Sequence, residues 1–265
     1  MTWLQAVILG VVEGITEFLP ISSTGHMIIT SSLLGIAKDD FTKLFEICVQ
    51  LGAILSVVVL YWKKFFDLSR LQFYIKLIVA VIPALALGYL LSDKIDELLE
   101  SPTTVGVSLL AGGIILLFID KVFTRPTIDK EQDISYMKGF AVGLWQVLAM
   151  IPGVSRSAAS IIGGMQQKLT RKVAAEFSFF LAVPTMCAAT GYKVLKAFKT
   201  QPEMLKDSHN LAMLAVGNIV AFIVALIAIK TFIQYVQRHS FRAFGVYRII
   251  AGIVILALIA AKVIA

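Results

Sequence analysis

Residues 13–26, EGITEFLPISSTGH, gather polar side chains inside an otherwise apolar N-terminal region. Glu13 and Glu17 are four positions apart, so on a helix they share one face with their Cβ atoms about 5–6 Å apart. Two carboxylates this close repel each other unless a cation, a proton or an arginine lies between them. Carboxylate oxygens suit Mg²⁺ or Ca²⁺, above all when a phosphate completes the coordination shell. The pair therefore predicts a divalent-cation site.

The alternative for these glutamates is that one is protonated and both only hydrogen-bond between helices. Acidic side chains inside a membrane are costly, at about 2.5–3.5 kcal/mol each on insertion scales, and are seldom retained for packing alone. We therefore favour the functional interpretation.

Hydroxyl side chains follow Pro20, where a second short helix is predicted to begin. Free N–H groups and the positive end of the helix dipole make Ser22, Ser23 and Thr24 a favourable place for an anion. Plain N-capping is the alternative, but capping does not explain His26, which lies on the same helix face as Ser23. A histidine within reach of a serine hydroxyl predicts general-base activation of a serine nucleophile.

A second polar segment, PGVSRS at residues 152–157, interrupts the later half of the chain. Gly153 permits a tight turn, and Arg156 offers a planar fork suited to two phosphate oxygens. Ser155 and Ser157 supply hydroxyl donors, and Ser160 lies one helical turn further along. A buried arginine requires an anionic partner. That partner is either one of the two glutamates, a substrate phosphate, or each in turn.

The remaining polar residues of the apolar segments are weaker candidates. They are predicted to hydrogen-bond between helices, and they are Glu46, Gln50, Glu176 and Asn218. Cys48 and Cys187 also fall inside apolar segments, so we predict packing roles for them and no disulfide.

Composition defines the class of protein. Of the 265 residues, 58% are hydrophobic and 15% charged, and the mean hydropathy is +0.85. The apolar residues form long runs, which indicate transmembrane helices. The net charge of +7 comes from lysines and arginines scattered between these runs. They indicate topology and lipid headgroup contacts, so the expected surroundings are a bilayer and not nucleic acid.

The apolar runs predict six full transmembrane helices and two interrupted pairs. The full spans are 44–62, 71–91, 104–123, 173–191, 211–236 and 246–264. The first interrupted pair is 3–19, stopped by Pro20, followed by 27–36; the second is 137–151, stopped by Pro152, followed by a piece ending near Lys168. Each piece is too short for a hydrocarbon core about 30 Å thick. We therefore predict two re-entrant helix–loop–helix pairs, surrounded by protein or by a water-filled cavity.

The order of elements repeats within a single membrane domain, with halves 1–123 and 137–265. Setting Gly10 over Gly143 places Glu13 over Gln146, and PISST falls near PGVSRS after a one-residue gap. A re-entrant pair returns to its own side and three spans cross the membrane. The second half is therefore inserted upside down, as an inverted repeat of the kind used by many transporters.

Lysines and arginines orient the chain. Fifteen of them, Arg248 included, fall on one side of the predicted topology and eight on the other, with Arg156 left out as a loop-tip residue. The richer side is predicted to be cytoplasmic. Both termini are then outside, and the first re-entrant loop enters from the outer face.

EGITEFLPISSTGH and PGVSRSAAS, separated by three predicted spans, resemble the two signature regions of the undecaprenyl-diphosphate phosphatase family, also called the bacitracin-resistance family. The resemblance extends to the length, the order of spans and the repeat. It implies an enzyme of the bacterial plasma membrane that removes the terminal phosphate of undecaprenyl diphosphate. Its product would be the lipid carrier used for peptidoglycan and other envelope polymers.

The resemblance also assigns residues to family motifs. Glu13 and Glu17 fall on the acidic motif, Ser22, Ser23 and His26 on the serine–histidine segment, and Ser155, Arg156 and Ser160 on the serine–arginine motif. Ser160 stands where the family has threonine, which retains the hydroxyl. Ala158 stands where glycine is usual.

The resulting hypothesis is a metal-dependent phosphatase. The lipid diphosphate enters laterally between helices, and Mg²⁺ or Ca²⁺ at Glu13 and Glu17 neutralises diphosphate oxygens. Arg156 stabilises the charge on the transferred phosphoryl group. Ser23, deprotonated by His26, attacks the terminal phosphorus, and water then releases phosphate. His26 itself, or a water activated by the cation, is the alternative nucleophile.

A different class remains open, because fold alone does not decide function. An inverted repeat with broken helices also suits a polyprenyl-phosphate flippase or an anion transporter. In either case the site is expected to open to the periplasm or cell exterior, and a homodimer is compatible with the sequence.

Overall fold

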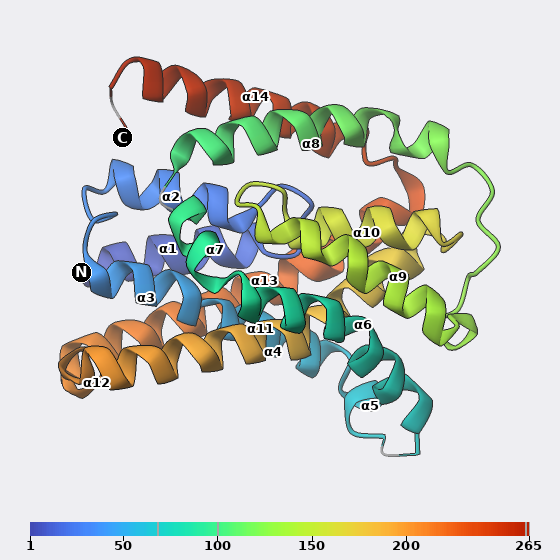
Figure 1. The fold of residues 1–265 in the computed structure, drawn as a ribbon, viewed down its shortest axis with the longest axis horizontal. Coiled ribbons are helices and arrows are strands. Elements are labelled where there is room, and N and C mark those ends of the chain that lie inside the picture. The colour runs from blue at the N-terminus through green and yellow to red at the C-terminus, as the bar shows by residue number, and fades with distance from the viewer. Residues whose placement is uncertain (68, 100, 263, 265) are drawn as a thin grey trace.

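The computed structural model describes residues 1–67, 69–99, 101–262 and 264, and their regular structure is helical (Figure 1). The one β-type pairing among them is an isolated bridge between Ile128 and Leu169. Residues 68 and 100 fall in predicted polar connections and residue 263 in the predicted last span. Those parts of the predictions lie outside the described residues.

The named elements are helices throughout the described residues. They are α1 (Trp3–Thr16), α2 (Ser23–Leu33), α3 (Asp40–Cys48), α4 (Gln50–Leu60), α5 (Trp62–Phe65), α6 (Leu71–Leu90), α7 (Ser92–Leu99), α8 (Pro102–Val122), η1 (Glu131–Asp133), α9 (Tyr136–Val147), η2 (Leu148–Met150), α10 (Arg156–Gln166), α11 (Arg171–Thr200), α12 (Pro202–Lys206), α13 (Ser208–Arg238) and α14 (Arg242–Ala260). The predicted all-α class is confirmed.

Six of these segments are long and apolar enough to cross a membrane. They are Asp40–Leu60 (α3 with α4), α6, α8, α11, α13 and α14, and they match the six predicted spans with shifted ends. The largest shift is in α11, which continues to Thr200, beyond the predicted end at residue 191. Hydropathy falls in that last part because lysines appear, but lysine is a good helix former. Composition marks the end of the apolar stretch and not the end of the helix.

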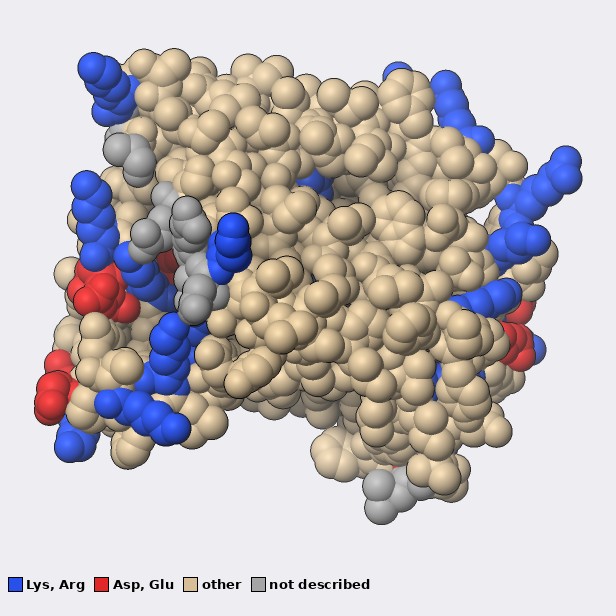
Figure 2. All heavy atoms as spheres, in the orientation of Figure 1, with Lys and Arg blue, Asp and Glu red and all other residues tan. Residues whose placement is uncertain are grey.

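The outer surface is that of a multi-pass membrane protein. Large apolar side chains such as Leu85, Ile114 and Ile253 are exposed. In Figure 2 lysines, arginines and acids gather at the two ends of the visible face, and the broad middle is almost free of charge. The start of α1 and the end of α14 lie at the same end of the molecule (Figure 1), as an even number of crossings requires.

The two interrupted pairs are helical hairpins whose short helices differ from the predicted ranges. Helix α1 ends at Thr16 and turns occupy the next five positions, whereas the prediction extended the helix to residue 19. Helix α2 begins at Ser23, because the Ser22 hydroxyl accepts the backbone N–H of Gly25 as an N-cap. Helix α9 likewise ends at Val147 and is followed by the 3-10 turn η2.

The hairpins have the same local structure at a constant sequence spacing of 133 positions. Ser22 and Ser155 are both N-caps with positive φ, at 70° and 73°. After the second helix of each hairpin, Gly35 and Lys168 have φ of 71° and 67°. The same spacing relates the opening N-caps, Thr2 and Ser135. The match runs without the one-residue gap that we expected.

Glycines let each hairpin approach a long helix closely. A Cβ atom on Gly10 of α1 would lie 2.7 Å from the carbonyl oxygen of Gly217 in α13. In the second hairpin, a Cβ atom on Gly143 of α9 would lie 1.9 Å from the carbonyl oxygen of Ala80 in α6. Apolar surface gives little driving force for association in lipid, so helices pack through small residues of this kind. The sequence-equivalent glycines thus make equivalent contacts.

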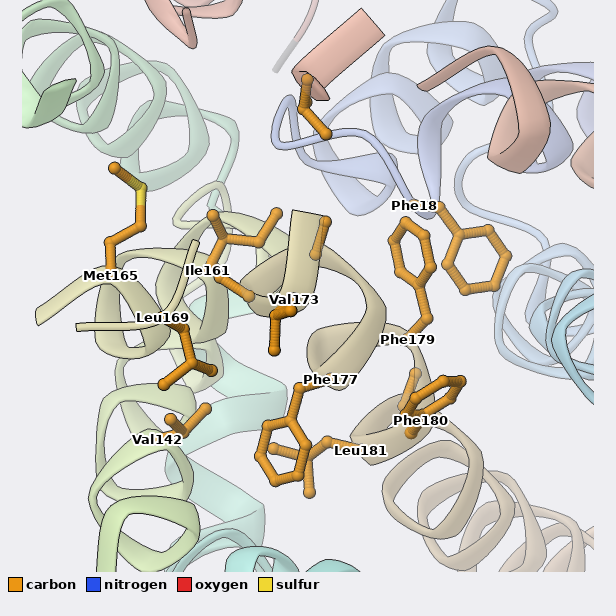
Figure 3. Packing of buried hydrophobic residues seen from close by; sticks show 14 of the residues in the cluster. Phe18, Val142, Ile161, Met165, Leu169, Val173, Phe177, Phe179, Phe180 and Leu181 are labelled. Atoms are coloured by element: carbon orange, nitrogen blue, oxygen red, sulfur yellow. The ribbon is translucent and has the colours of Figure 1, made fainter. Parts of the chain in front are cut away.

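An aromatic cluster around α11 joins the hairpins to the long helices (Figure 3). Phe18, from the loop after α1, packs edge-on against Phe179, with ring centroids 5.1 Å apart. Phe180 makes further edge contacts to Tyr61 and Phe73. Both hairpins therefore rest on one rigid core, which fixes where their loops lie.

Replacing Gly143 tests this packing. Gly143→Ala should lower the free energy of unfolding by about 1–3 kcal/mol, the usual cost of overpacking, because the new methyl group meets a backbone oxygen. Gly191→Ala is the control, since a Cβ atom there meets no atom within 4 Å. It should leave stability unchanged or raise it by up to about 1 kcal/mol through helix propensity. Equal denaturation curves for both variants in detergent would contradict the close contact.

Candidate active site

The loops of the two hairpins meet in the interior of the molecule (Figure 1). The Ser157 hydroxyl, on the first turn of α10, donates to the backbone carbonyl of Phe18 at 2.8 Å. Beside it, the guanidinium of Arg156 forms an ion pair with Glu17 at 3.0 Å. The sequence placed these two motifs 139 positions apart, and the fold brings them into direct contact.

Both terminal nitrogens of the Arg156 guanidinium are bound by the protein. Nη2 donates to Glu17 Oε1 at 3.0 Å, and Nη1 donates to the Ser178 carbonyl at 2.9 Å. Among the residues that the structure describes, the buried Nε atom has no hydrogen-bond partner. Ser160 braces this arrangement, with its hydroxyl 2.7 Å from the Arg156 carbonyl and 2.6 Å from the Ser178 hydroxyl. Of the predicted partners of Arg156, Glu17 contacts it in the structure, and binding of a substrate phosphate stays a prediction.

Ser23 and His26 do not form the pair that the sequence predicted. The Ser23 hydroxyl donates to Glu17 Oε2 at 2.6 Å. The ring of His26 is instead bound at Nδ1, 2.7 Å from the Ser22 carbonyl, and at Nε2, 2.6 Å from the hydroxyl of Tyr247. The Ser22 carbonyl, one helical turn before His26, binds the imidazole. The Ser23 hydroxyl is bound to the Glu17 carboxylate instead.

Glu13 is completely buried one helical turn before Glu17. Neither of its carboxylate oxygens has a hydrogen-bond partner within the described part of the chain. No group of three or more histidine, cysteine or acidic side chains suited to a metal occurs among the described residues. A cation here would therefore take few ligands from the protein, which is the usual arrangement for Mg²⁺ beside a phosphate-bearing substrate.

Within the described residues, the hydroxyls of the two N-caps accept a hydrogen bond and donate none. Ser22 accepts the N–H of Gly25 at 3.3 Å, and Ser155 accepts the N–H of Ala158 at 3.2 Å. Both serines have positive φ, which is uncommon for residues other than glycine and often marks a functional site. Thr24 is half-buried on the first turn of α2. A helix start with free backbone donors is a position that favours an anion.

Other predicted substrate contacts are used within the protein. Ser157 donates its hydroxyl hydrogen to the Phe18 carbonyl, and Ser160 is fully buried. Gly153 has φ of 89° and gives its carbonyl to Arg248. These three residues stabilise the loop. The sequence alone did not distinguish this role from phosphate binding.

Arg248 corrects the topology count, which placed it at the cytoplasmic surface. Its side chain is completely buried, with 0% exposure. It makes five hydrogen bonds, and their acceptors are all carbonyl oxygens: Pro20 (3.1 Å), Val154 (3.0 Å), Gly153 (2.9 Å), Ser108 (3.1 Å) and Leu109 (3.4 Å). The arginine thus ties both hairpin loops to α8. The sequence signal for this role was the position of Arg248 near the start of an apolar run. The same position is also typical of a charged residue at the membrane surface.

Two of the four weaker polar candidates, Asn218 and Glu176, hydrogen-bond between helices as predicted, whereas the buried Oε1 of Glu46 has no hydrogen-bond partner among the described residues. Asn218 Oδ1 accepts the backbone N–H of Gly52 at 2.7 Å, and Glu176 accepts the hydroxyl of Tyr61 at 3.4 Å. Both cysteines are free thiols; Cys48 is buried, but Cys187 is exposed on α11 and does not pack in the core.

The fold and the site define a multi-pass α-helical membrane protein with acid, serine and arginine side chains buried where two helical hairpins meet. Comparison with known families identifies the family to which this membrane protein belongs. The chain belongs to the family described as Bacitracin resistance protein BacA, whose profile matches residues 6–254.

Curated relatives match over nearly the full length. A protein of Flavobacterium johnsoniae named undecaprenyl-diphosphatase is 61% identical, covering 97% of this chain and 96% of that protein. Proteins with the same name from Bdellovibrio bacteriovorus and Campylobacter jejuni are 53% and 45% identical, covering 98% and 95% of this chain and 97% and 92% of those proteins.

Removing the Arg248 side chain tests its role as the tie between the loops. Arg248→Met should lower the free energy of unfolding by about 3 kcal/mol or more, because three loop carbonyls lose a donor at about 1–3 kcal/mol each. Arg242→Met is the matched control: it lies on the same helix but is exposed. Denaturation in detergent, followed by tryptophan fluorescence, measures the difference. Similar losses in both variants would show that the buried bonds contribute little.

Proposed function

We propose that the protein hydrolyses undecaprenyl diphosphate to undecaprenyl phosphate and inorganic phosphate, which recycles the lipid carrier for peptidoglycan and envelope polymers. The names of its relatives support this substrate. The observation that carries the proposal is the set of unpartnered buried atoms beside the Glu17–Arg156 ion pair. They are both oxygens of Glu13 and the Nε of Arg156.

Such atoms are expensive, at about 1–3 kcal/mol each or more when charged. An acceptor pair and a donor left open in one cluster match a ligand that combines a cation with a phosphate. The cation would satisfy the Glu13 oxygens, and a phosphate oxygen would accept the N–H of Arg156. A phosphatase substrate with a bound divalent ion has this chemistry.

Mg²⁺ or Ca²⁺ is the proposed cofactor, held by Glu13 with Glu17 and by diphosphate oxygens. When bound, such a cation withdraws charge from the phosphate oxygens during transfer. Glu13 is the better fit of the two ligands, because both Glu17 oxygens already accept hydrogen bonds from Ser23 and Arg156.

Ser23 is the proposed nucleophile, and Glu17 takes its proton, since the hydroxyl already donates to that carboxylate at 2.6 Å. The serine oxygen forms a bond to the terminal phosphorus while the bond to the bridging oxygen breaks, and undecaprenyl phosphate leaves. In the second step water attacks the phosphoserine, the bond between phosphorus and the serine oxygen breaks, and Glu17 returns its proton to that oxygen. His26 Nε2 accepts the proton of the water after its hydrogen bond with the Tyr247 hydroxyl opens, and inorganic phosphate is released. This assigns Glu17 the role that the sequence gave to His26 in the first step.

Arg156 and the two helix starts are proposed to bind the terminal phosphate. Charge on the transferred phosphoryl group is stabilised by donors fixed in place before the reaction. Arg156 supplies its open Nε, and Ser22 and Ser155 supply hydroxyl hydrogens beside the first N–H groups of α2 and α10. Ser178 keeps the guanidinium in position.

We propose further that the hairpins are re-entrant and that the halves form an inverted repeat. Equivalent caps at a spacing of 133 positions support this, as do the equivalent contacts of Gly10 with α13 and Gly143 with α6. The protein then lies in the bacterial plasma membrane with both termini outside. Its site opens to the periplasm or cell exterior, and the lipid enters from the side.

Phosphate release from purified protein tests the function. In detergent with Mg²⁺, the wild type should release phosphate from undecaprenyl diphosphate, and a chelator should stop it. Glu17→Ala and Arg156→Ala should reduce kcat/KM by at least about a hundredfold, as loss of a transition-state contact does. Glu13→Gln should raise the Mg²⁺ requirement about tenfold or more. Arg171→Ala, in the Asp120 ion pair away from the site, is the control. A flippase or transporter would release no phosphate.

Trapping the covalent intermediate tests the assigned steps. His26→Gln should slow the second step, so that a phosphoserine accumulates when the terminal phosphate is radiolabelled. Ser23→Ala should give no labelled protein. Label that persists in Ser23→Ala would eliminate the serine as nucleophile and favour His26 or direct attack by water.

Single cysteines test the inversion and the orientation. With Cys48 and Cys187 replaced by serine, Lys38→Cys should react with a membrane-impermeant maleimide on intact spheroplasts, whereas Lys130→Cys should react only after lysis. Both positions are exposed in connections between helices, so reactivity reports the side. Labelling of both from one side would rule out inverted halves, and the reverse pattern would turn the site toward the cytoplasm.

A further inference from the structure

A cavity of about 430 Å³ lies where the ends of α8 and α13 meet the start of α11 and the loop between the two halves. Its volume is within the range of about 300–1,000 Å³ that is usual for small-ligand sites. Part of its wall is apolar, and three of the apolar side chains are buried: Met165, Leu169 and Val236. None of its lining residues belongs to the active site described above. It is therefore a separate feature of the molecule with a partly apolar wall.

Lys172 is the cation of the cavity wall that has no acidic partner. The acid of the wall, Asp120, is already bound at both oxygens, by the Arg171 side chain and by the backbone N–H of Phe241. Lys172 is exposed and forms no ion pair with any described residue. The acid on its own helix, Glu176, binds the hydroxyl of Tyr61 instead. Since Arg171 and Asp120 cancel, the wall has a net positive charge.

Further cations surround this cavity. The segments that line it each carry an exposed lysine or arginine next in sequence to a lining residue: Lys121 on α8, Arg125 in the loop, Lys168 before α11 and Arg238 at the end of α13. None of these four forms an ion pair within the described part of the chain. Positive charge therefore accumulates at this end of the molecule, where α8 finishes on the right of Figure 1, and it favours an anionic ligand.

The position of the cavity along the helices points to a lipid. Helices α8, α11 and α13 are each long and apolar enough to cross a membrane, so a cavity at their ends lies at the level of the lipid headgroups. A soluble anion would use the cations but not the buried apolar part of the wall. A phospholipid uses both, because its phosphate is attached to acyl chains.

We propose that this cavity binds an anionic phospholipid, with the headgroup phosphate at Lys172 and part of an acyl chain against the apolar wall. The first N–H groups of α11 have no partner within the helix and also donate to the phosphate. Basic pockets between transmembrane helices on the cytoplasmic side of a membrane bind anionic headgroups in this way. The excess of lysine and arginine predicts that side for this end of the molecule. The inference does not depend on the proposed phosphatase activity.

Native mass spectrometry of the purified full chain tests the proposal. The protein in neutral detergent is mixed with equal amounts of phosphatidylglycerol and phosphatidylcholine that have the same acyl chains. The wild type should retain one phosphatidylglycerol in preference to phosphatidylcholine. Lys172→Glu should weaken this binding about tenfold or more, because one cation is lost and a repelling charge is added. Glutamate is favourable in the first turn of a helix, so the variant should fold.

Arg238→Glu provides a second variant on a different helix and should also weaken the binding, by about fivefold. Lys63→Glu is the matched control: Lys63 is an exposed cation on the same predicted side of the membrane, but it does not line the cavity. It should leave the retained lipid unchanged. A wild type without a preference for phosphatidylglycerol, or equal losses in Lys172→Glu and Lys63→Glu, would overturn the proposal.

Glycerol 3-phosphate distinguishes a lipid from a free anion, since it has the phosphate without the acyl chains. It should displace phosphatidylglycerol only at an excess of about a hundredfold or more, because burying a few methylene groups has an effect of that size. Displacement at equal concentration would identify a site for a soluble anion and contradict the assignment to a lipid.

Discussion

The structure depends on satisfying the backbone of two loops that lie inside the protein. Each hairpin breaks its helices, and the freed carbonyls of a loop inside the protein need hydrogen-bond donors. Arg248 meets this need with one side chain: it donates to carbonyls from both loops and from α8. An arginine can do this because its five donors are rigidly spread in a plane. Its charge is balanced by carbonyl dipoles, since every bond it makes among the described residues goes to a carbonyl oxygen.

The contact between the two loops also brings two opposite charges together. Glu17 comes from one hairpin and Arg156 from the other, and each would be costly to bury alone. Their ion pair at 3.0 Å therefore belongs to the assembled interior and not to either half. The same contact holds Ser23, which donates to the second oxygen of Glu17. Among the described residues, both Glu13 oxygens and the Arg156 Nε have no hydrogen-bond partner, so the ion pair that stabilises the interior lies next to the atoms to which we assign ligand binding.

The two hairpins show how one local structure carries two chemistries. Ser22 and Ser155 have nearly the same backbone and cap their helices in the same way. The next residues differ, serine in the first hairpin and arginine in the second, and Glu13 of the first hairpin corresponds to Gln146 of the second at the same spacing. Equal backbones give both hairpins the same capped helix start, while unequal side chains place the carboxylates on one hairpin and the guanidinium on the other.

The sequence by itself determined the membrane class, the six spans and the two broken pairs, because hydropathy and proline act locally. It also singled out Glu13, Glu17, Ser23, His26 and Arg156, since polar groups in apolar runs are costly to bury and usually have a function. Tertiary structure decided the partners. Ser23 meets Glu17 and not His26, because the imidazole binds the Ser22 carbonyl and Tyr247. Tyr247 contacts His26, and Arg248 contacts Pro20 in the first loop, each from more than 200 positions away. Sequence spacing describes one helix face, and only the assembled fold determines what stands opposite it.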